Sequence, residues 1–142
     1  MNDQPSENKP LLLLVEDEQD TADLVRLIME EEGYHVRHTA DGHEALEQIA
    51  LMPPPSLVLL DIQLPHVDGI TVLETIRATP DWQNVQVIML TAVSDEQRIR
   101  QAVSLSVQDY VLKPFRRETL LRYVGQSRRT RHKRYDTSFL DD

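Results

Sequence analysis

Five side chains with useful chemistry each come at the end of a short apolar run: Glu16, Asp17, Asp61, Thr91 and Lys113. Three carboxylates that meet in one place repel one another unless a cation lies between them. Carboxylate oxygens are hard ligands that suit Mg²⁺. A carboxylate beside Mg²⁺ and an ammonium group can approach a phosphoryl group, because positive charge neutralises the oxygens of both anions. The three acids therefore suggest a magnesium site, and the five groups together are compatible with chemistry on a phosphoryl group.

The apolar runs explain how these groups could meet. They lie at residues 11–15, 56–61, 87–91 and 109–112, and a less apolar run at 34–40 has the character of an edge strand. Short apolar runs that alternate with helical patterns indicate parallel strands buried on both faces. Functional residues of such sheets gather at the carboxyl ends of the strands. We therefore expect the five groups at one edge of a sheet.

Helical patterns follow each of the five runs. Leu24, Leu27 and Ile28 recur at helical spacing after Asp20, which can cap a helix that ends near Gly33. The spacing of Ser94 and Gln97 is that of a capping box at the start of a fourth helix. The remaining helices are expected after Asp41, ahead of Pro80, and from Glu118 to about Ser127.

Four motifs in chain order resemble the signature of the receiver domain of two-component response regulators. They are Glu16-Asp17, Asp61 with Pro65 and Asp68-Gly69, Thr91-Ala92, and Lys113-Pro114-Phe115. The resemblance runs from about Leu11 to Val124. It agrees with the fold class expected from the alternating pattern, which is α/β: a flavodoxin-like doubly wound (βα)5 fold with a parallel five-stranded sheet in the order 2-1-3-4-5.

The resemblance implies a role for each acid. Asp61 would take a phosphoryl group from a phosphohistidine of a histidine kinase or phosphotransfer protein. Asp17 and Asp61 would bind Mg²⁺ directly, Glu16 would bind largely through water, and the backbone carbonyl of Gln63 would complete the protein ligands. Each acid alone has a plainer interpretation as a solvated loop residue.

The resemblance also implies roles for Lys113, Thr91 and Tyr110. A cis bond before Pro114 would turn Lys113 towards Asp61, and the Thr91 hydroxyl would donate to the phosphoryl group. Thr91 and Tyr110 would then form a switch, with the tyrosine turning into space that the threonine vacates. Output would pass to a downstream protein through the face made by helix 4, strand 5 and helix 5. The alternative for Tyr110 is a half-buried ring with its hydroxyl in water.

The sequence departs from the family pattern at two places outside the chemistry. Ser106-Val107 stands where the family commonly has Gly-Ala, and Leu64 stands where Met often precedes the loop proline. The family pattern therefore does not determine the shape of the junction between helix 4 and strand 5 in this chain.

Length and composition suggest one domain of 142 residues without cysteine. Residues 1–10 are expected to be a disordered lead-in, 11–127 the receiver domain, and 128–142 a basic arm with a short acidic end; we expect no second domain. The chain has no signal-peptide pattern and no apolar run near the roughly 20 residues that span a bilayer. We therefore expect a cytoplasmic protein without membrane insertion, present as a monomer or a phosphorylation-dependent homodimer.

Charge is distributed unevenly within the net −9 of the chain. Residues 1–115 hold 20 acidic and 7 basic side chains, and residues 116–142 hold 4 acidic and 8 basic ones. The acidic body argues against nucleic-acid binding, but the basic arm leaves open contact with nucleic acid, regulated by the receiver, or with the acidic body of another copy.

An enzyme of another class is the main alternative. Metal-dependent phosphatases with an Asp nucleophile use a similar sheet, but they usually carry a second acid two residues after the nucleophile. This chain has Gln63 there. We therefore expect no enzyme in the ordinary sense, but a protein that catalyses only its own phosphorylation and dephosphorylation.

Overall fold

A computed structural model of the chain describes residues 9–92 and 96–129, with side chains up to residue 126. Its strands are β1 (Leu11–Val15), β2 (His35–Thr39), β3 (Leu57–Asp61), β4 (Gln86–Thr91) and β5 (Asp109–Leu112). All neighbouring strands are parallel, and their order is β2-β1-β3-β4-β5. This order confirms the doubly wound flavodoxin-like fold, with β2 at one edge as expected.

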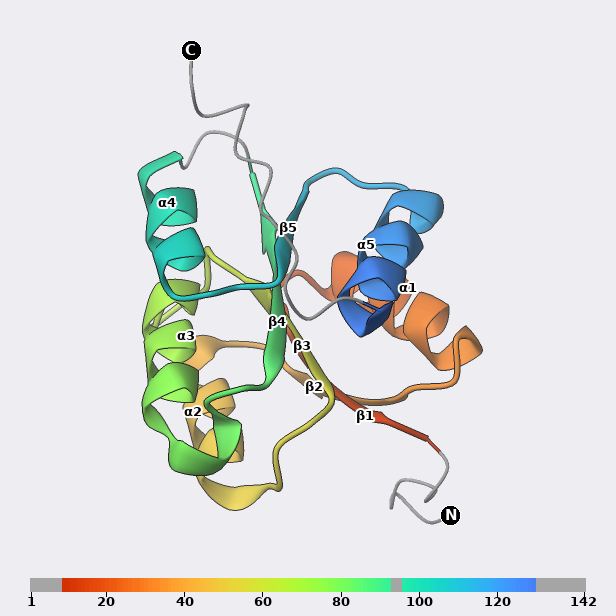
Figure 1. Ribbon diagram of the computed structural model, residues 1–142. Coiled ribbons are helices and arrows are strands. Elements are labelled where there is room, and N and C mark those ends of the chain that lie inside the picture. The colour runs from red at the N-terminus through yellow and green to blue at the C-terminus, as the bar shows by residue number, and fades with distance from the viewer. Residues whose placement is uncertain (1–8, 93–95, 130–142) are drawn as a thin grey trace.

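Helices cover both faces of the sheet. They are α1 (Gln19–Glu31), α2 (Gly42–Leu51), α3 (Gly69–Ala78), α4 (Glu96–Ser104) and α5 (Arg117–Arg129), with a short 3₁₀ helix, η1 (Pro80–Trp82). Figure 1 shows α1 and α5 on one face and α2, α3 and α4 on the other. The chain changes face because right-handed crossovers to opposite sides of β1 place their helices on opposite sides of the sheet.

The strands divide the core into two layers. Leu12 and Leu14 of β1 pack with α1 and α5, whereas Leu13 and Val15 pack with α2, α3 and α4. Successive strand residues point to opposite faces, so a strand of continuous leucine supplies both layers at once. Full burial of each such side chain stabilises the fold by about 2 kcal/mol. Every residue of β3 is buried, which fixes Asp61 at the end of a rigid element.

Helix α1 differs from the expected pattern in its cap and in its buried stripe. Its N-cap residue is Glu18, so Asp20 lies in the first turn and the predicted cap was wrong. The helix buries Val25, Ile28, Met29 and Ala22, while Leu24 and Leu27 are 49% and 55% exposed. The small Ala22 belongs to the buried stripe and shifts it away from the two leucines. Apolar side chains therefore remain on the surface of α1.

Two glycines bring helix starts close to the β3–α3 loop. A Cβ on Gly69 would lie 2.1 Å from the carbonyl oxygen of Asp61, and one on Gly42 would lie 1.8 Å from that of Val67. Side chains cap both helices: Asp41 accepts from the amide of Glu44, and Asp68 accepts from that of Thr71. The loop that follows Asp61 is thus held between the starts of α2 and α3.

Arg77 of α3 holds the junction between α4 and β5. Its guanidinium donates to the carbonyl oxygens of Leu105 and Ser106, both at 2.8 Å, and to that of Val85 at 2.7 Å. Ser106 has a φ of 63° in the left-handed region, where glycine is favoured. Ser106 therefore adopts the left-handed backbone conformation in place of the glycine that the family commonly has in this turn. The hydrogen bonds from Arg77 hold the turn.

Several expectations fall outside the described residues: the lead-in up to residue 8, Ser94 of the capping box, and the arm from residue 130 onward. Helix α5 continues to Arg129, two residues past the expected end of the receiver domain at residue 127. Within residues 9–92 and 96–129, no helix combines the length and apolarity needed to cross a bilayer.

Candidate phosphoacceptor site

The strand register brings the predicted groups to one edge. Val15 pairs with Leu60, and Thr91 pairs with Leu112. The residues that follow β1 and end β3 therefore lie side by side, as do those that end β4 and follow β5. The expected meeting of Glu16, Asp61 and Lys113 at the carboxyl ends of the strands is seen.

Lys113 bridges two of the acids. Its Nζ lies 2.9 Å from Oε1 of Glu16 and 3.0 Å from Oδ2 of Asp61. The Lys113 amide donates to the carbonyl oxygen of Thr91 at 2.7 Å, which continues the β4–β5 pairing. The Lys113–Pro114 bond is cis, as the resemblance implied. An ammonium group is thus in place beside the carboxylate of Asp61.

Glu16 is completely buried, and neighbours hold its backbone and side chain. Oε2 accepts from the Glu18 amide at 3.2 Å, and the Glu16 amide donates to the Thr39 carbonyl at 3.1 Å. The Glu16 carbonyl oxygen lies 2.8 Å from Nε2 of His38. Sequence reasoning missed His38. Its place, one residue before the end of the edge strand, was the available signal.

Three acids form a cluster suited to a divalent cation. Glu16, Asp17 and Asp61 each offer a carboxylate oxygen, and these atoms lie within 4.8 Å of one another. Asp17 is exposed, so the cluster opens to solvent, as Mg²⁺ with retained waters requires. The Gln63 amide donates to Oδ1 of Asp61 at 3.2 Å. Ligation by the Gln63 carbonyl stays a prediction.

Burial changes the acidity of Asp61. Desolvation and the nearby charge of Glu16 raise the pKa of Asp61 to about 7, although Lys113 and the Gln63 amide oppose this shift. Burial lowers the pKa of Lys113, but hydrogen bonds and charge from Glu16 and Asp61 outweigh it and raise the pKa above its ordinary value. The two acids therefore repel each other across a lysine that stays protonated, and a divalent cation would relieve this repulsion.

Thr91 and Tyr110 both lie inside the protein. Thr91 is 1% exposed and its hydroxyl donates to the Ala92 carbonyl at 3.2 Å. Tyr110 is 6% exposed and belongs to the core layer that contains Ile99 and Ala102 of α4. The ring is therefore buried rather than half-exposed. Its inward movement on phosphorylation stays a prediction.

A link to α4 escaped the sequence analysis. The carboxylate of Asp68 caps α3 with Oδ1 and forms an ion pair with Arg98 of α4 through Oδ2. The two residues lie 30 positions apart in the chain, and neither has a local pattern that announces the pair. The loop after Asp61 is thus tied directly to α4.

An apolar recess adjoins the site. It has a volume of about 400 Å³ and lies between the start of α1 and the β5–α5 loop. Its walls are Glu18, Thr21, Leu24, Lys113, Pro114 and Phe115. The exposed Leu24 therefore lines a recess that also borders Lys113.

Comparisons with known proteins agree with this geometry. The family model described as the response regulator receiver domain matches residues 12–125. The chain is 35% identical over 115 residues to the DNA-binding dual master transcriptional regulator RpaA of Synechocystis, covering 81% of the chain and 47% of RpaA. It is 37% identical over 110 residues to the response regulator ArlR of Staphylococcus saprophyticus, covering 78% and 48%. The chain thus spans about half the length of these relatives.

A solved structure supplies a further comparison. The receiver domain of the sensor histidine kinase PA1611 from Pseudomonas aeruginosa is 29% identical, with a TM-score of 0.75. The match covers 83% of this chain and 96% of that one, and that crystal structure has a magnesium ion coordinated in its active-site cleft.

Proposed function

Because this chain belongs to the response regulator receiver family, we propose that it accepts a phosphoryl group on Asp61 from a phosphohistidine and passes the signal on by protein contact. The contact of Lys113 Nζ with both Glu16 and Asp61 is the observation that supports this most directly. It places a cation where two anions must approach each other.

Several residues of this chain would take part in phosphoryl transfer. A carboxylate oxygen of Asp61 attacks phosphorus, the phosphorus–nitrogen bond breaks, and the histidine leaves with that electron pair. The Lys113 ammonium and the Thr91 hydroxyl would contact the phosphoryl oxygens. Mg²⁺ held by Glu16, Asp17, Asp61 and the Gln63 carbonyl would neutralise negative charge on the transferring group.

The surface beside the cleft supports docking of a donor protein. Leu24 and Leu27 are exposed on α1, and Leu24 lines the recess next to Lys113. Exposed apolar side chains that border a reactive site favour a protein partner over a small molecule. A histidine kinase or phosphotransfer protein that packs on α1 would bring its histidine to the mouth of the cleft.

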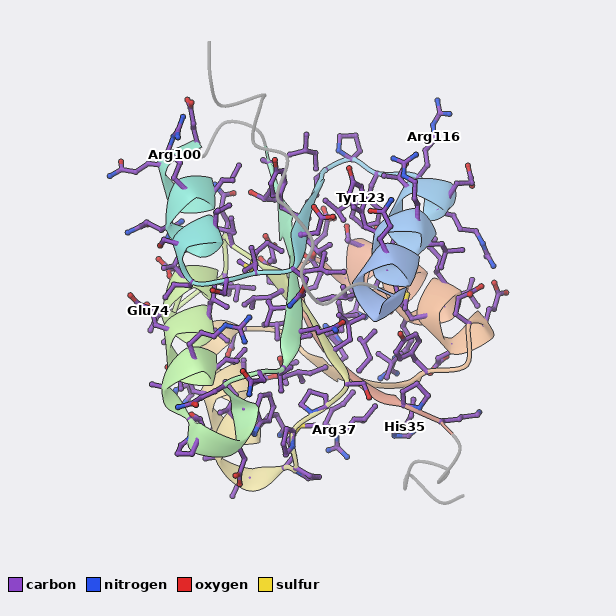
Figure 2. The ribbon with its side chains drawn as sticks, in the orientation of Figure 1. His35, Arg37, Glu74, Arg100, Arg116 and Tyr123 are labelled. Atoms are coloured by element: carbon purple, nitrogen blue, oxygen red, sulfur yellow. The ribbon has the colours of Figure 1, made fainter. Side chains whose placement is uncertain are left out.

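Output would use the surface formed by α4, β5 and α5. Among the described residues of α4, only Ile99 and Ala102 are buried, so few side chains hold this helix to the sheet. Figure 2 shows Arg100 of α4 and Arg116 of α5 pointing outward on either side of β5. We place the protein in the cytoplasm, where it would act on a downstream protein and catalyse only its own phosphorylation and dephosphorylation.

Mass spectrometry after incubation with acetyl phosphate and Mg²⁺ tests the assignment. We expect one phosphoryl group on the wild-type chain and none after chelation of Mg²⁺. Asp61→Asn should abolish the modification, whereas Asp81→Asn should not, because Asp81 is an exposed acid in the turn before β4. Full modification of Asp61→Asn, or an unchanged rate in the presence of chelator, would contradict the proposal.

The alternative of an Asp-dependent phosphatase receives less support. Gln63 occupies the position two residues after Asp61, and an amide cannot supply a proton to a leaving group in the way that a carboxylic acid does. Turnover of phosphate monoesters by the purified chain would favour this alternative over the phosphoacceptor role.

A further inference from the structure

His38 contacts the backbone of the turn that carries two of the acids. Its Nε2 lies 2.8 Å from the carbonyl oxygen of Glu16, and the amide of the same residue donates to Thr39. Residues at the end of β2 therefore contact both the backbone nitrogen and the carbonyl oxygen of Glu16. Asp17 follows directly and is exposed, so its direction depends on how this backbone is held.

The strand pattern explains why a side chain is needed here. The β1–β2 pairing ends at Val15 and Thr39, and the chain then turns towards the α2 cap at Asp41. Val36 and His38 share one face of β2, because residues two apart in a strand point the same way. Through its side chain, His38 thus adds a contact between β2 and the chain that follows β1, beyond the last paired residue.

We infer that His38 is a positioning residue for the metal-binding turn, acting through the hydrogen bond from Nε2 to the Glu16 carbonyl. Both the neutral tautomer protonated at Nε2 and the imidazolium donate from this atom. Residues that orient metal ligands typically change metal affinity about 10- to 100-fold when they are lost. As far as it concerns Mg²⁺, the inference rests on the proposed function.

Three variants separate positioning from general stability. His38→Leu removes the donor and keeps the bulk, while His38→Gln keeps an N–H donor at a similar reach. His35→Leu is the matched control: His35 is on the same strand and partly buried, and Figure 2 shows it at the lower, amino-terminal end of the sheet. Two measurements apply to each: amide exchange at Asp17 and Glu18 without metal, and calorimetric titration with Mg²⁺.

For His38→Leu we expect faster exchange at these amides and Mg²⁺ affinity lower by about tenfold. His38→Gln should restore both, and His35→Leu should leave both as in the wild type. The inference is overturned if His38→Leu binds Mg²⁺ like the wild type, if His38→Gln fails to rescue it, or if His35→Leu has the same effect. If the wild-type chain binds no Mg²⁺, the metal part of the proposed function fails, and the exchange measurement alone decides whether His38 holds the turn.

Discussion

Lys113 is shared between two buried carboxylates, and this sharing sets the electrostatics of the site. Glu16 and Asp61 are 0% and 5% exposed, and both lie within 3.0 Å of Nζ. One ammonium group cannot neutralise two carboxylates, so the pair remains costly to ionise in a low-dielectric surrounding. The pairing of two buried carboxylates with one ammonium group therefore reduces the stability of the metal-free fold.

The raised pKa of Asp61 gives a pH-dependent prediction. The pKa of Asp61 is about 7 in the folded chain and 3.8 in its ordinary, unperturbed state, so the folded state binds the proton more tightly. Compared with a variant that has a neutral residue at position 61, the wild type loses no free energy of unfolding below pH 3.8. It becomes progressively less stable than that variant as the pH rises to about 7. Asp61→Asn should therefore raise the free energy of unfolding by about 2–4 kcal/mol at pH 8 in chelator.

Denaturant titrations at pH 4 and pH 8 measure this difference. The wild type and Asp61→Asn should have nearly equal stability at pH 4 and diverge at pH 8, and Mg²⁺ should narrow the gap. An equal difference at both pH values would show that the gain does not come from ionisation of Asp61.

At the level of elements, β3 is fixed while α4 is held weakly. Every residue of β3 is buried, whereas α4 buries only Ile99 and Ala102 and is tied to Asp68 through Arg98. We therefore expect a small energy change at the end of β4 or in the β3–α3 loop to shift α4 more readily than β3.

The ion pair between Arg98 and Asp68 gives a prediction for α4. Arg98→Gln should speed amide exchange in residues 96–104 by about two- to fivefold, because a partly exposed ion pair contributes up to about 1 kcal/mol. Arg100→Gln is the matched control, since Arg100 pairs with Glu96 inside the same helix. Equal exchange in the two variants would contradict the role of the tie to Asp68.

Thr91 and Tyr110 give a second prediction at this scale. Thr91→Ala should leave phosphorylation of Asp61 largely intact, because Lys113 and the acids remain. The change in amide exchange over residues 96–124 on phosphorylation should become smaller, because the hydroxyl that would couple the site to the core is lost. A phosphorylation response equal to that of the wild type would remove Thr91 from the switch.

The whole molecule has an acidic body and a basic carboxyl-terminal segment. Truncation after Ser127 removes five of the eight basic side chains beyond residue 115, Arg128 and Arg129 of α5 among them. We expect little loss of stability and intact phosphorylation, because α5 is anchored by Leu120 and Val124. Sedimentation and duplex titration of both forms at two salt concentrations would distinguish self-association from phosphate contact, which weakens steeply as salt rises. A large fall in stability would show that the segment belongs to the fold.

Much of this arrangement was predictable because it depends on local pattern. Leucine runs set the strands, and parallel topology brought Asp61 and Lys113 together. The features that the sequence analysis missed depend on three-dimensional contacts that local pattern does not encode. The buried stripe of α1 excludes Leu24, and Arg98 pairs with a residue 30 positions away. His38 contacts the carbonyl oxygen of Glu16, which follows the neighbouring strand β1. The left-handed Ser106 was hidden because a serine replaced the residue type that normally marks such a turn.

The position of β1 has a consequence for biosynthesis. This strand is made first among the five, yet it lies inside the sheet between β2 and β3. During synthesis β2 can cover one edge of β1 early, but the other edge stays open until residues 57–61 leave the ribosome. An uncovered strand of four leucines and a valine is a strong template for pairing with another chain. The nascent protein therefore passes through an aggregation-prone interval that ends when β3, the strand that carries Asp61, is added.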